Sequence, residues 1–256
     1  MHDHDDDAPP PAQPDWAYFL DVDGTLIEIA ARPEQVVVPP GLIELLRGLH
    51  RAAGGACALV SGRAIAELDR LFAPLRLPAA GVHGVEWRGD GACGDRPVEV
   101  GGDPETAAAL DRARAGLAAL QAAHGGLTVE DKGVALAVHY RAAPALAGVV
   151  GEATAALVAR EPALCAQPGK MVVELKPAGV DKGHAIRRHL GEAPFRGRRP
   201  VYVGDDLTDE HGFAAVNAVD GISIRVGDGA PTLAHWHLAS VAAVHRWLAA
   251  LSANRG

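Results

Sequence analysis

Short apolar runs alternate with amphipathic stretches along most of the chain. In the amphipathic stretches, apolar residues recur at the three- and four-residue spacing of a helix face. This alternation is typical of strand–helix units built around a parallel sheet. The expected strands are 17–20, 57–60, 200–203 and, as the last strand, 221–226, and the expected helices are 41–53, 61–72, 182–190 and 241–252.

The middle of the chain has a different pattern. It reads as two helices, each followed by a local hairpin, which is an α-β-β-α-β-β order. The expected helices are 104–123 and 144–160, and the expected hairpins pair 127–132 with 134–141 and 163–167 with 171–176. We therefore expect an inserted α+β domain at 103–178, within an α/β core formed by 15–102 and 179–256.

Side-chain alternation in the expected hairpins separates two faces of the inserted sheet. Leu136, Val138 and Tyr140 share one face and are expected to pack on the helices. The opposite face is polar and contains Glu130, Lys132, His139, Arg141, Glu174 and Lys176. Two interpretations stay open from the pattern alone: a half-solvated sheet with surface ion pairs, or a binding face.

Charge excludes some classes of partner. The 256 residues contain 32 Asp and Glu against 24 Lys and Arg, a formal net charge of −8. This balance argues against a general nucleic-acid binder and against a polybasic membrane-surface protein. Residues 1–14 are acidic and then proline-rich and are expected to be a disordered tail, in which His2 and His4 could bind a metal loosely but a solvated charge run is the favoured interpretation.

Cysteine spacing and hydropathy indicate the compartment. Cys57, Cys93 and Cys165 are scattered without the spacing of a disulfide framework or a zinc site. The chain has no secretory signal pattern and no apolar stretch of about 18 residues. We expect a cytoplasmic protein, a monomer, with neither a membrane nor a nucleic acid as partner.

Acidic residues follow two of the expected strands. Asp21 and Asp23 are one residue apart at the end of the first strand and precede Gly24 and Thr25. Two close carboxylates are unfavourable unless a cation or a shared proton compensates them, and Mg²⁺ is the natural cation for such a pair. Asp205, Asp206 and Asp209 repeat the pattern after a late strand. Because ligands bind at the carboxyl ends of strands in open α/β sheets, these acids predict a metal-dependent site there.

These motifs resemble those of the haloacid dehalogenase (HAD) superfamily of phosphotransferases. The segment 19–26 resembles its first motif, and Ser61-Gly62-Arg63, Lys182 and Gly204-Asp205-Asp206 resemble the second, third and fourth, in the right order. Within this superfamily the chain is most similar to trehalose-6-phosphate phosphatases. The stretches that carry this closer resemblance are 81–86, 138–141, 173–177, 182–183 and 204–210.

The resemblance implies a fold, an activity and a set of roles. The fold would be a Rossmann-like core with a parallel sheet and an inserted α+β cap that selects the substrate. The activity would be Mg²⁺-dependent hydrolysis of trehalose 6-phosphate to trehalose and inorganic phosphate through an aspartyl-phosphate. The resemblance implies that Asp21 is the nucleophile and Asp23 the general acid and base. Phosphate would be bound by Ser61, Gly62 and Lys182, and the metal by Asp21, the Asp23 carbonyl, Asp205 and Asp206. The sugar would be bound by Glu130, Lys132, His139, Arg141 and Glu174.

Alternatives remain at the level of the residues and of the reaction. Ser61 could only cap a helix, Asp206 could orient a ligand instead of binding the metal, Asp209 could only add charge to a first helical turn, and His83 could be a turn residue. The substrate could be sucrose phosphate, mannosyl-3-phosphoglycerate or a hexose phosphate. The reaction could be that of a phosphomutase, or the chain could bind a sugar phosphate without turnover.

Overall fold

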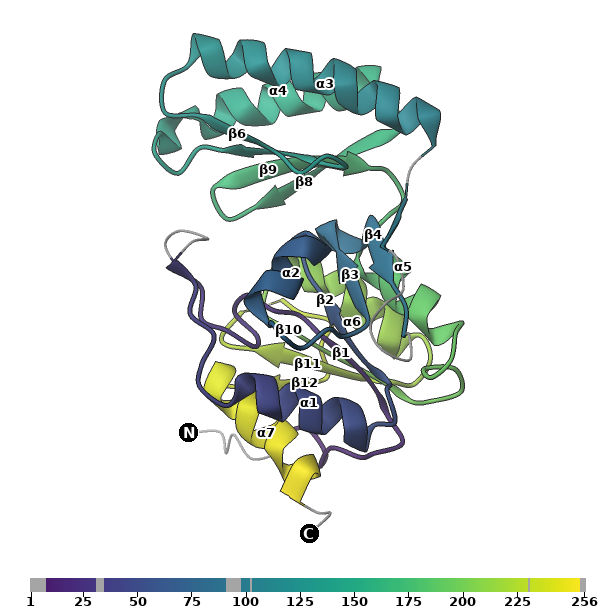
Figure 1. Ribbon diagram of the computed structural model, residues 1–256. Helices are drawn as coiled ribbons and strands as arrows, with labels where there is room; N and C mark the ends of the chain where they lie inside the picture. The colour runs from purple at the N-terminus through teal and green to yellow at the C-terminus, as the bar shows by residue number, and fades with distance from the viewer. Residues whose placement is uncertain (1–7, 31–34, 91–97, 102, 230, 254–256) are drawn as a thin grey trace. The chain divides into compact units, whose positions relative to one another are not determined.

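The computed structural model describes residues 8–30, 35–90, 98–101, 103–229 and 231–253. The chain forms two compact units, drawn as ribbons in Figure 1. The first contains the chain up to Val98 and from Asp181 onward, and the second is the contiguous segment Glu99–Val180. The expected insert, 103–178, lies within this second unit.

The first unit is built on a mixed sheet whose strand order is β12-β11-β10-β1-β2-β3-β4-β5, in which the edge strand β5 already belongs to the segment Glu99–Val180. The strands from β12 to β3 in this order run parallel to one another, and β4 runs antiparallel to β3. The strands are β1 (Ala17–Leu20), β2 (Cys57–Val60), β3 (Ala79–Gly81), β4 (Glu86–Arg88), β5 (Glu99–Val100), β10 (Pro200–Gly204), β11 (Ile222–Val226) and β12 (Trp236–Leu238).

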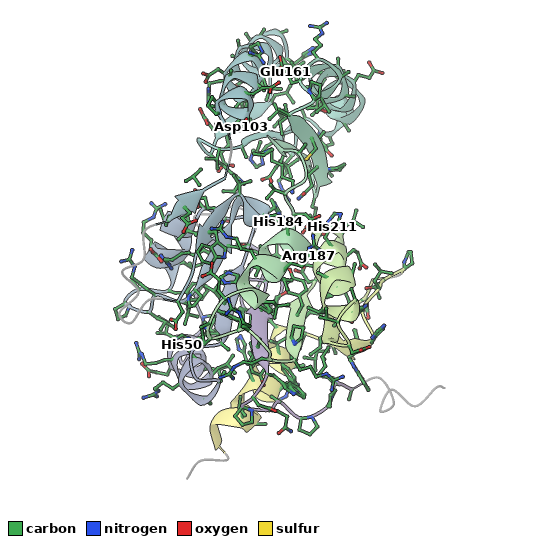
Figure 2. All side chains as sticks on the ribbon, turned by 90° about the vertical axis from the view of Figure 1, so that its right-hand side faces the viewer. His50, Asp103, Glu161, His184, Arg187 and His211 are labelled. Atoms are coloured by element: carbon green, nitrogen blue, oxygen red, sulfur yellow. The ribbon has the colours of Figure 1, made fainter. Side chains whose placement is uncertain are left out.

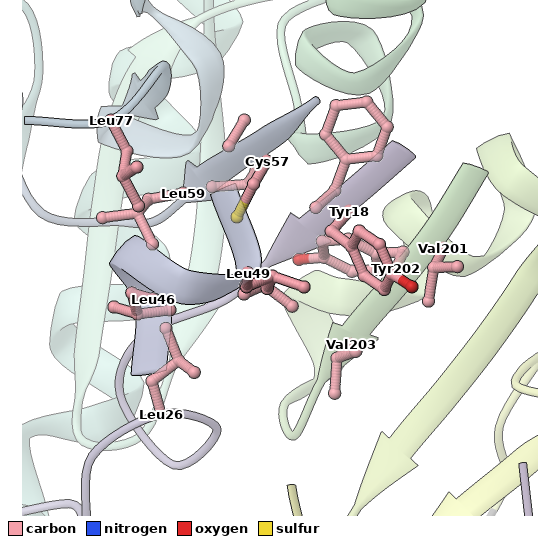
Figure 3. Close-up of a cluster of buried hydrophobic side chains, with 14 of the residues drawn as sticks. Tyr18, Leu26, Leu46, Leu49, Cys57, Leu59, Leu77, Val201, Tyr202 and Val203 are labelled. Carbon is pink, nitrogen blue, oxygen red and sulfur yellow. The ribbon is translucent and has the colours of Figure 1, made fainter. Parts of the chain in front are cut away.

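Burial explains why the central strands have continuous apolar sequences. Every side chain of β1 and β2 is buried, as expected for a parallel sheet covered on both faces. Figure 3 shows part of this core, in which Tyr18, Leu49 and Tyr202 lie among the aliphatic side chains. Cys57 is fully buried in the same cluster, and burial raises the pKa of its thiol to about 12. It is therefore a small core residue and not a reactive thiol.

Apart from α6, which was not among the expected helices, the helices of the first unit lie where the apolar spacing predicts them. They are α1 (Leu42–Ala52), α2 (Ile65–Leu71), α5 (Lys182–Leu190), α6 (Glu210–Asn217) and α7 (Val241–Ala253). In α1 the buried residues are Leu42, Leu46 and Leu49, one face of the helix. Across the described residues, no helix has both the length and the apolar character needed to cross a membrane.

The parallel register brings the predicted motifs to one edge of the sheet. Leu20 lies beside Leu59 of β2 on one side and beside Val203 of β10 on the other. Asp21 and Ser61 therefore leave adjacent strands at their carboxyl ends, and the acidic segment after β10 begins at the same edge.

The second unit is an antiparallel sheet with two helices. Its strand order is β6-β7-β9-β8. The elements are α3 (Pro104–Ala123), β6 (Thr128–Asp131), β7 (Leu136–His139), a 3₁₀ turn (Pro144–Leu146), α4 (Ala147–Arg160), β8 (Leu164–Gly169) and β9 (Val172–Pro177). Leu136 and Val138 pack with the buried residues of both helices, and Tyr140 packs against this cluster, so the predicted apolar face is confirmed.

Polar side chains hold the ends of the two helices. Asp103 precedes α3 and accepts a hydrogen bond from the backbone N–H of Thr106 (2.8 Å), which makes it the helix N-cap. Glu161 follows α4 and pairs with Arg112 of α3 (2.6 Å). Asp103 and Glu161 are labelled in Figure 2.

Two predictions about the first unit are wrong, and β3 and β12 were not predicted. The helix expected from Ser61 begins only at Ile65, because residues 61–64 form a loop and not a helical turn. The strand at 221–226 is not the last one, since β12 adds a parallel edge strand after it. Apolar runs at β3 and β12 are too short to stand out from the surrounding sequence, so neither strand was predicted.

The expected disordered tail also needs correction. Residues 8–14 lie against the first unit: Ala12 is buried, the Pro10 carbonyl accepts from Trp247 Nε1 (2.9 Å), and the Gln13 carbonyl accepts from the Tyr18 hydroxyl (2.6 Å). Aromatic N–H and O–H groups at the edge of the core thus bind a segment whose proline content alone indicated disorder. The acidic residues of the tail, with His2 and His4, lie outside the described residues, as does Cys93.

His189 is an uncharged histidine inside the first unit. Its ring lies between those of Phe19, Trp87 and Phe195, at centroid distances of 5.9, 5.2 and 5.0 Å. Neither ring nitrogen has a hydrogen-bond partner within the described part of the chain, and the residue has no exposed surface. Burial, with a smaller contribution from the Arg188 charge, lowers the pKa of His189 to about 3.

We expect this histidine to destabilise the fold in mild acid. Between the ordinary histidine pKa near 6.5 and pH 3, the unfolded chain binds a proton that the native chain does not, so the free energy of unfolding falls as the pH falls. The loss is about 1.4 kcal/mol per pH unit, or about 2 kcal/mol between pH 7.5 and pH 5. Urea unfolding at both pH values should show a smaller loss for His189→Phe than for the parent chain. Equal losses would contradict this account of His189.

Candidate active site

A buried lysine lies between two buried carboxylates at the carboxyl edge of the sheet. Lys182, the first residue of α5, donates to Asp21 Oδ1 (2.7 Å) and to Asp209 Oδ1 (2.5 Å). All three side chains are almost entirely inaccessible to solvent. A cation at the start of a helix is unfavourable for the helix dipole. The negative charges of Asp21 and Asp209 compensate the positive charge of Lys182, which the helix dipole does not.

Asp209 has every hydrogen-bonding position of its carboxylate occupied by protein donors. Oδ1 accepts from Lys182 and from the Tyr202 hydroxyl, and Oδ2 accepts from the backbone N–H groups of Asp205 (2.9 Å) and Asp206 (2.8 Å). The side chain therefore holds the lysine and the turn after β10 together. Of the two alternatives for Asp209, the one in which it only adds charge to a helical turn does not account for these contacts.

The pKa values in this cluster reflect burial and mutual charge. Burial raises the pKa of Asp21 well above its usual range, against the opposing effect of Lys182. Burial and the Asp209 charge together raise the pKa of Asp205 to about 7. For Asp209 burial would raise the pKa, but the charge and hydrogen bond of Lys182 outweigh it and hold the pKa below its usual range. The cluster has more carboxylates than cations, and a further positive charge would stabilise it.

Asp21 and Asp205 could hold a metal ion, with Asp209, whose oxygens already accept from protein donors, close beside them. One oxygen from each of the three lies within 4.8 Å of the others. Gly24 makes room for this arrangement, since a Cβ there would lie 2.1 Å from Asp205 Oδ2. An all-oxygen ligand set with excess negative charge suits a hard divalent cation.

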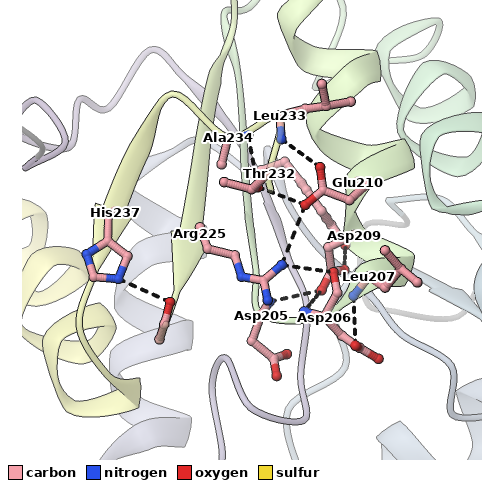
Figure 4. A network of polar contacts seen from close by, with 12 residues as sticks. Asp205, Asp206, Leu207, Asp209, Glu210, Arg225, Thr232, Leu233, Ala234 and His237 are labelled. Carbon is pink, nitrogen blue, oxygen red and sulfur yellow. Dashed lines mark hydrogen bonds and ion pairs between the residues drawn. The ribbon is translucent and has the colours of Figure 1, made fainter. Parts of the chain in front are cut away.

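Asp206 lies next to this cluster but is used differently. Its Oδ1 accepts from the backbone N–H of Leu207 (2.7 Å) and caps the 3₁₀ turn Leu207–Asp209. The structure thus groups Asp209 with Asp21 and Asp205, and the predicted direct ligand role of Asp206 stays a prediction. Figure 4 shows the carboxylates of Asp205 and Asp206 on this turn.

Arg63 binds the predicted general acid. Its Nε and Nη2 donate to the two carboxylate oxygens of Asp23, each at 2.7 Å, in a bidentate ion pair. The hydrogen bond to Asp23 raises the pKa of the Arg63 guanidinium above its already high value. Ser61 Oγ accepts from the backbone N–H of Arg63 (3.1 Å), so one residue contacts both the serine and the aspartate.

The loop that contains Ser61 and Gly62 is held by the segment after β3. The Ser61 carbonyl accepts from His83 N (2.9 Å), and the Arg63 carbonyl accepts from Val82 N (3.0 Å). Val82 and His83 both have positive φ values, 46° and 54°, which non-glycine residues adopt at a cost. A Cβ at Gly62 would lie 2.6 Å from the His83 ring, so only glycine fits there. His83 is a turn residue whose backbone N–H donates to the Ser61 carbonyl, in line with the turn interpretation.

Ser61 is not the cap of α2. The backbone N–H of Ile65 at the start of α2 donates to Glu86 Oε2 (2.6 Å), a carboxylate from β4. The serine hydroxyl precedes the helix by four residues and is buried at the sheet edge. The functional interpretation of Ser61 is therefore the one that the geometry favours.

A second polar network contacts the turn after β10. Glu210 accepts from the Thr232 hydroxyl (2.7 Å) and from Leu233 N (2.7 Å). Arg225 lies between Glu210 and the carbonyl of Asp206, at 3.5 and 3.4 Å (Figure 4). The network links α6 and β11 to the acidic turn.

The polar face of the second unit contains paired charges. His139 Nε2 lies 2.9 Å from Glu130 Oε2, and Lys132 Nζ donates to Glu174 Oε1 (2.5 Å). The hydrogen bond from His139 holds the pKa of Glu130 below its usual range. The other two members of the face contact the main chain, Arg141 at the Lys170 carbonyl (3.5 Å) and Lys176 at the Val180 carbonyl (2.7 Å).

Sequence reasoning missed three contributors to the catalytic edge. Tyr202 binds Asp209, Arg63 binds Asp23, and Glu86 caps α2. Tyr202 had a detectable signal, since a phenol in an otherwise aliphatic buried strand needs a hydrogen-bond partner. The partners of Arg63 and Glu86 could not be found from spacing.

Comparison with known proteins places this geometry in one family. The family model for trehalose-phosphatase matches residues 19–242. The chain is 43% identical to the trehalose-6-phosphate phosphatase of Escherichia coli K12 over 237 residues, which cover 91% of this chain and 85% of that protein.

Solved structures agree with the sequence comparison. The crystal structure of a trehalose-6-phosphate phosphatase related protein superimposes with a TM-score of 0.75 at 27% identity and covers 93% of this chain and 97% of that one. A HAD-superfamily phosphatase from Bacteroides thetaiotaomicron has the same fold, with a TM-score of 0.61 at 16% identity, covering 91% and 93%. The expected α/β fold of the HAD type is confirmed. The order of the motifs, the buried lysine between its carboxylates and the match over most of the chain agree: the chain belongs to the trehalose-phosphatase family.

Proposed function

We propose that this protein is a Mg²⁺-dependent phosphatase that hydrolyses trehalose 6-phosphate to trehalose and inorganic phosphate. One observation carries the proposal: in a chain of this family, the buried Asp21 accepts a hydrogen bond from Lys182 at the sheet edge where Asp205 and Asp209 lie within reach of one cation.

The chemistry divides into two displacements. In the first, an Asp21 oxygen attacks the phosphorus, the bond to the sugar oxygen breaks, and Asp23 gives that oxygen a proton. In the second, Asp23 takes a proton from water, the water oxygen attacks the aspartyl-phosphate, and Asp21 leaves as a carboxylate with release of phosphate. Arg63 binds both oxygens of Asp23 and fixes the orientation of its carboxylate.

The groups that would bind the phosphate oxygens are already held in place, so substrate binding would require little reorganisation of the protein. Ser61 offers a buried hydroxyl, and Gly62 follows it in the same loop, where the missing side chain leaves room for the His83 ring. Lys182 supplies a fixed positive charge for the charge that gathers in the transition state. Two carboxylates place this lysine before the substrate arrives.

The metal ion would bind to carboxylate oxygens of Asp21 and Asp205 and to the Asp23 carbonyl, with Asp209 or Asp206 beside them. When bound, it would neutralise the cluster and polarise the phosphoryl group. The oxygen donors and the raised pKa of Asp205 support this assignment, and Mg²⁺ is the divalent ion that suits carboxylates together with phosphate.

The second unit would act as the cap that selects the sugar. Glu130, Lys132, His139, Arg141 and Glu174 provide carboxylates and cations on one face of a sheet, a set suited to the hydroxyls of a disaccharide. A site built for those hydroxyls rejects esters that lack them. The monomeric state and the cytoplasmic location remain predictions of the sequence.

A phosphate-release panel tests the proposed function. With Mg²⁺ present we expect trehalose 6-phosphate to be hydrolysed at least about tenfold more efficiently than sucrose phosphate, mannosyl-3-phosphoglycerate or glucose 6-phosphate. Chelation with EDTA should abolish turnover, and added Mg²⁺ should restore it. Equal or better turnover of another ester would overturn the substrate assignment. An isomeric sugar phosphate formed without phosphate release would indicate a mutase, and binding without turnover a silent module.

A further inference from the structure

One row of residues crosses all four strands of the second unit's sheet. Ala137 in β7 lies opposite Glu130 of β6 on one side and opposite Glu174 of β9 on the other. Glu174 in turn lies opposite Gln167 of β8. Opposite residues in antiparallel strands point to the same face, so the row is Glu130, Ala137, Glu174, Gln167.

Small side chains occupy the centre of this face. In β7, Leu136 and Val138 point to the helices, and Ala137 points to the other face together with its neighbour Ala135. Both alanines are buried, with exposed fractions of 0% and 1%. Charged side chains from the flanking strands therefore cover them.

The Lys132–Glu174 ion pair depends on the small size of the Ala137 side chain. Lys132 directly follows β6 and Glu174 lies in β9, and these strands on either side of β7 are about 10 Å apart in a sheet. Their side chains nevertheless meet at 2.5 Å, so they must extend toward one another over β7. A branched or longer side chain at position 137 would stand in that path.

We propose that Ala137 and Gln167 determine the specificity of the sugar site, Ala137 by leaving room for Lys132 and Glu174 to converge and Gln167 by extending the polar row beyond Glu174. This inference rests on the proposed function. A carboxamide both donates and accepts, which suits a hydroxyl that does the same. Gln167 is partly exposed in the edge strand β8.

A valine at position 137 tests the steric part of the proposal. Ala137→Val should raise KM for trehalose 6-phosphate about tenfold and leave kcat/KM for p-nitrophenyl phosphate unchanged, because the small ester does not need the sugar site. Ala166→Val is the matched control. Ala166 is exposed in β8 and, like its cross-strand neighbour Leu175, points to the face of the sheet away from Gln167, and valine is favoured in strands. We expect the control to match the parent chain with both substrates.

Gln167→Ala tests the polar part without a risk to the core, since β8 is an edge strand. We expect KM for trehalose 6-phosphate to rise about fivefold with kcat nearly constant, and Gln167→Asn to recover part of the loss. Equal losses with both esters in either variant, or no loss with trehalose 6-phosphate, would overturn the proposal. If the parent chain prefers another sugar phosphate, the proposed function fails, and the same variants measured with that ester still decide whether this row selects the sugar.

Discussion

Asp21→Asn is expected to lose phosphatase activity by about 10³-fold or more while the chain keeps its fold. The amide cannot form the aspartyl-phosphate, so neither displacement can proceed. Stability should change little, because the substitution removes a buried charge whose pKa is already raised by burial and loses one hydrogen bond from Lys182. Phosphate release from trehalose 6-phosphate measures the activity, and urea unfolding measures the fold.

Asp15→Asn is the matched control for this result. Asp15 is exposed just before β1 and contacts neither the lysine nor the other acids of the site. The control should have the activity of the parent chain. Substantial phosphate release by Asp21→Asn, above about a tenth of the parent rate, would refute the assignment of Asp21 as nucleophile.

Asp209→Asn should produce the largest loss of stability. The substitution removes one of the two negative charges that compensate the buried Lys182, and it points an amide donor at groups that are themselves donors. Breaking a buried ion pair in this way costs about 3 kcal/mol or more. Because Asp209 also holds the turn that contains Asp205, we expect activity to fall about 100-fold as well.

Asp206→Asn separates the roles of the two neighbouring acids. Its carboxylate caps a 3₁₀ turn, so its loss should cost at most about 1 kcal/mol in urea unfolding. If Asp206 only supports the turn, the Mg²⁺ concentration for half-maximal activity should stay near that of the parent chain. A large increase in that concentration for Asp206→Asn, with none for Asp209→Asn, would place Asp206 and not Asp209 beside the metal.

Much of the fold could be read from the chain because its elements have clear apolar periods. The expected bounds of β2, α3 and α5 differ from the observed ones by no residue: Cys57–Val60, Pro104–Ala123 and Lys182–Leu190. Errors occurred where the period is too short to detect, as in β3 and β12, or where composition indicated disorder, as at 8–14. In those places long-range partners decide the structure, and Trp247 and Tyr18 are such partners.

The candidate site shows the same division. Asp21, Ser61, Lys182 and Asp205 were expected because each follows a strand or begins a helix within a contiguous motif. The pairing of Asp23 with Arg63 could not be expected, since the two residues are 40 positions apart and their contact depends on how the loops after β1 and β2 are oriented. The opposing uses of Asp206 and Asp209 depend likewise on the direction of two side chains within one turn.

The sequence by itself determined the fold class, the family resemblance and the chemical types present at the sheet edge, because these depend on local order: period, strand ends and short motifs. Only the tertiary structure decided which charge pairs with which. It placed Lys182 between Asp21 and Asp209, Arg63 on Asp23, and Lys132 across Ala137 to Glu174. The physical reason is that the partners of each buried charge are distant in the sequence. They come within hydrogen-bonding distance only once the strands are in register.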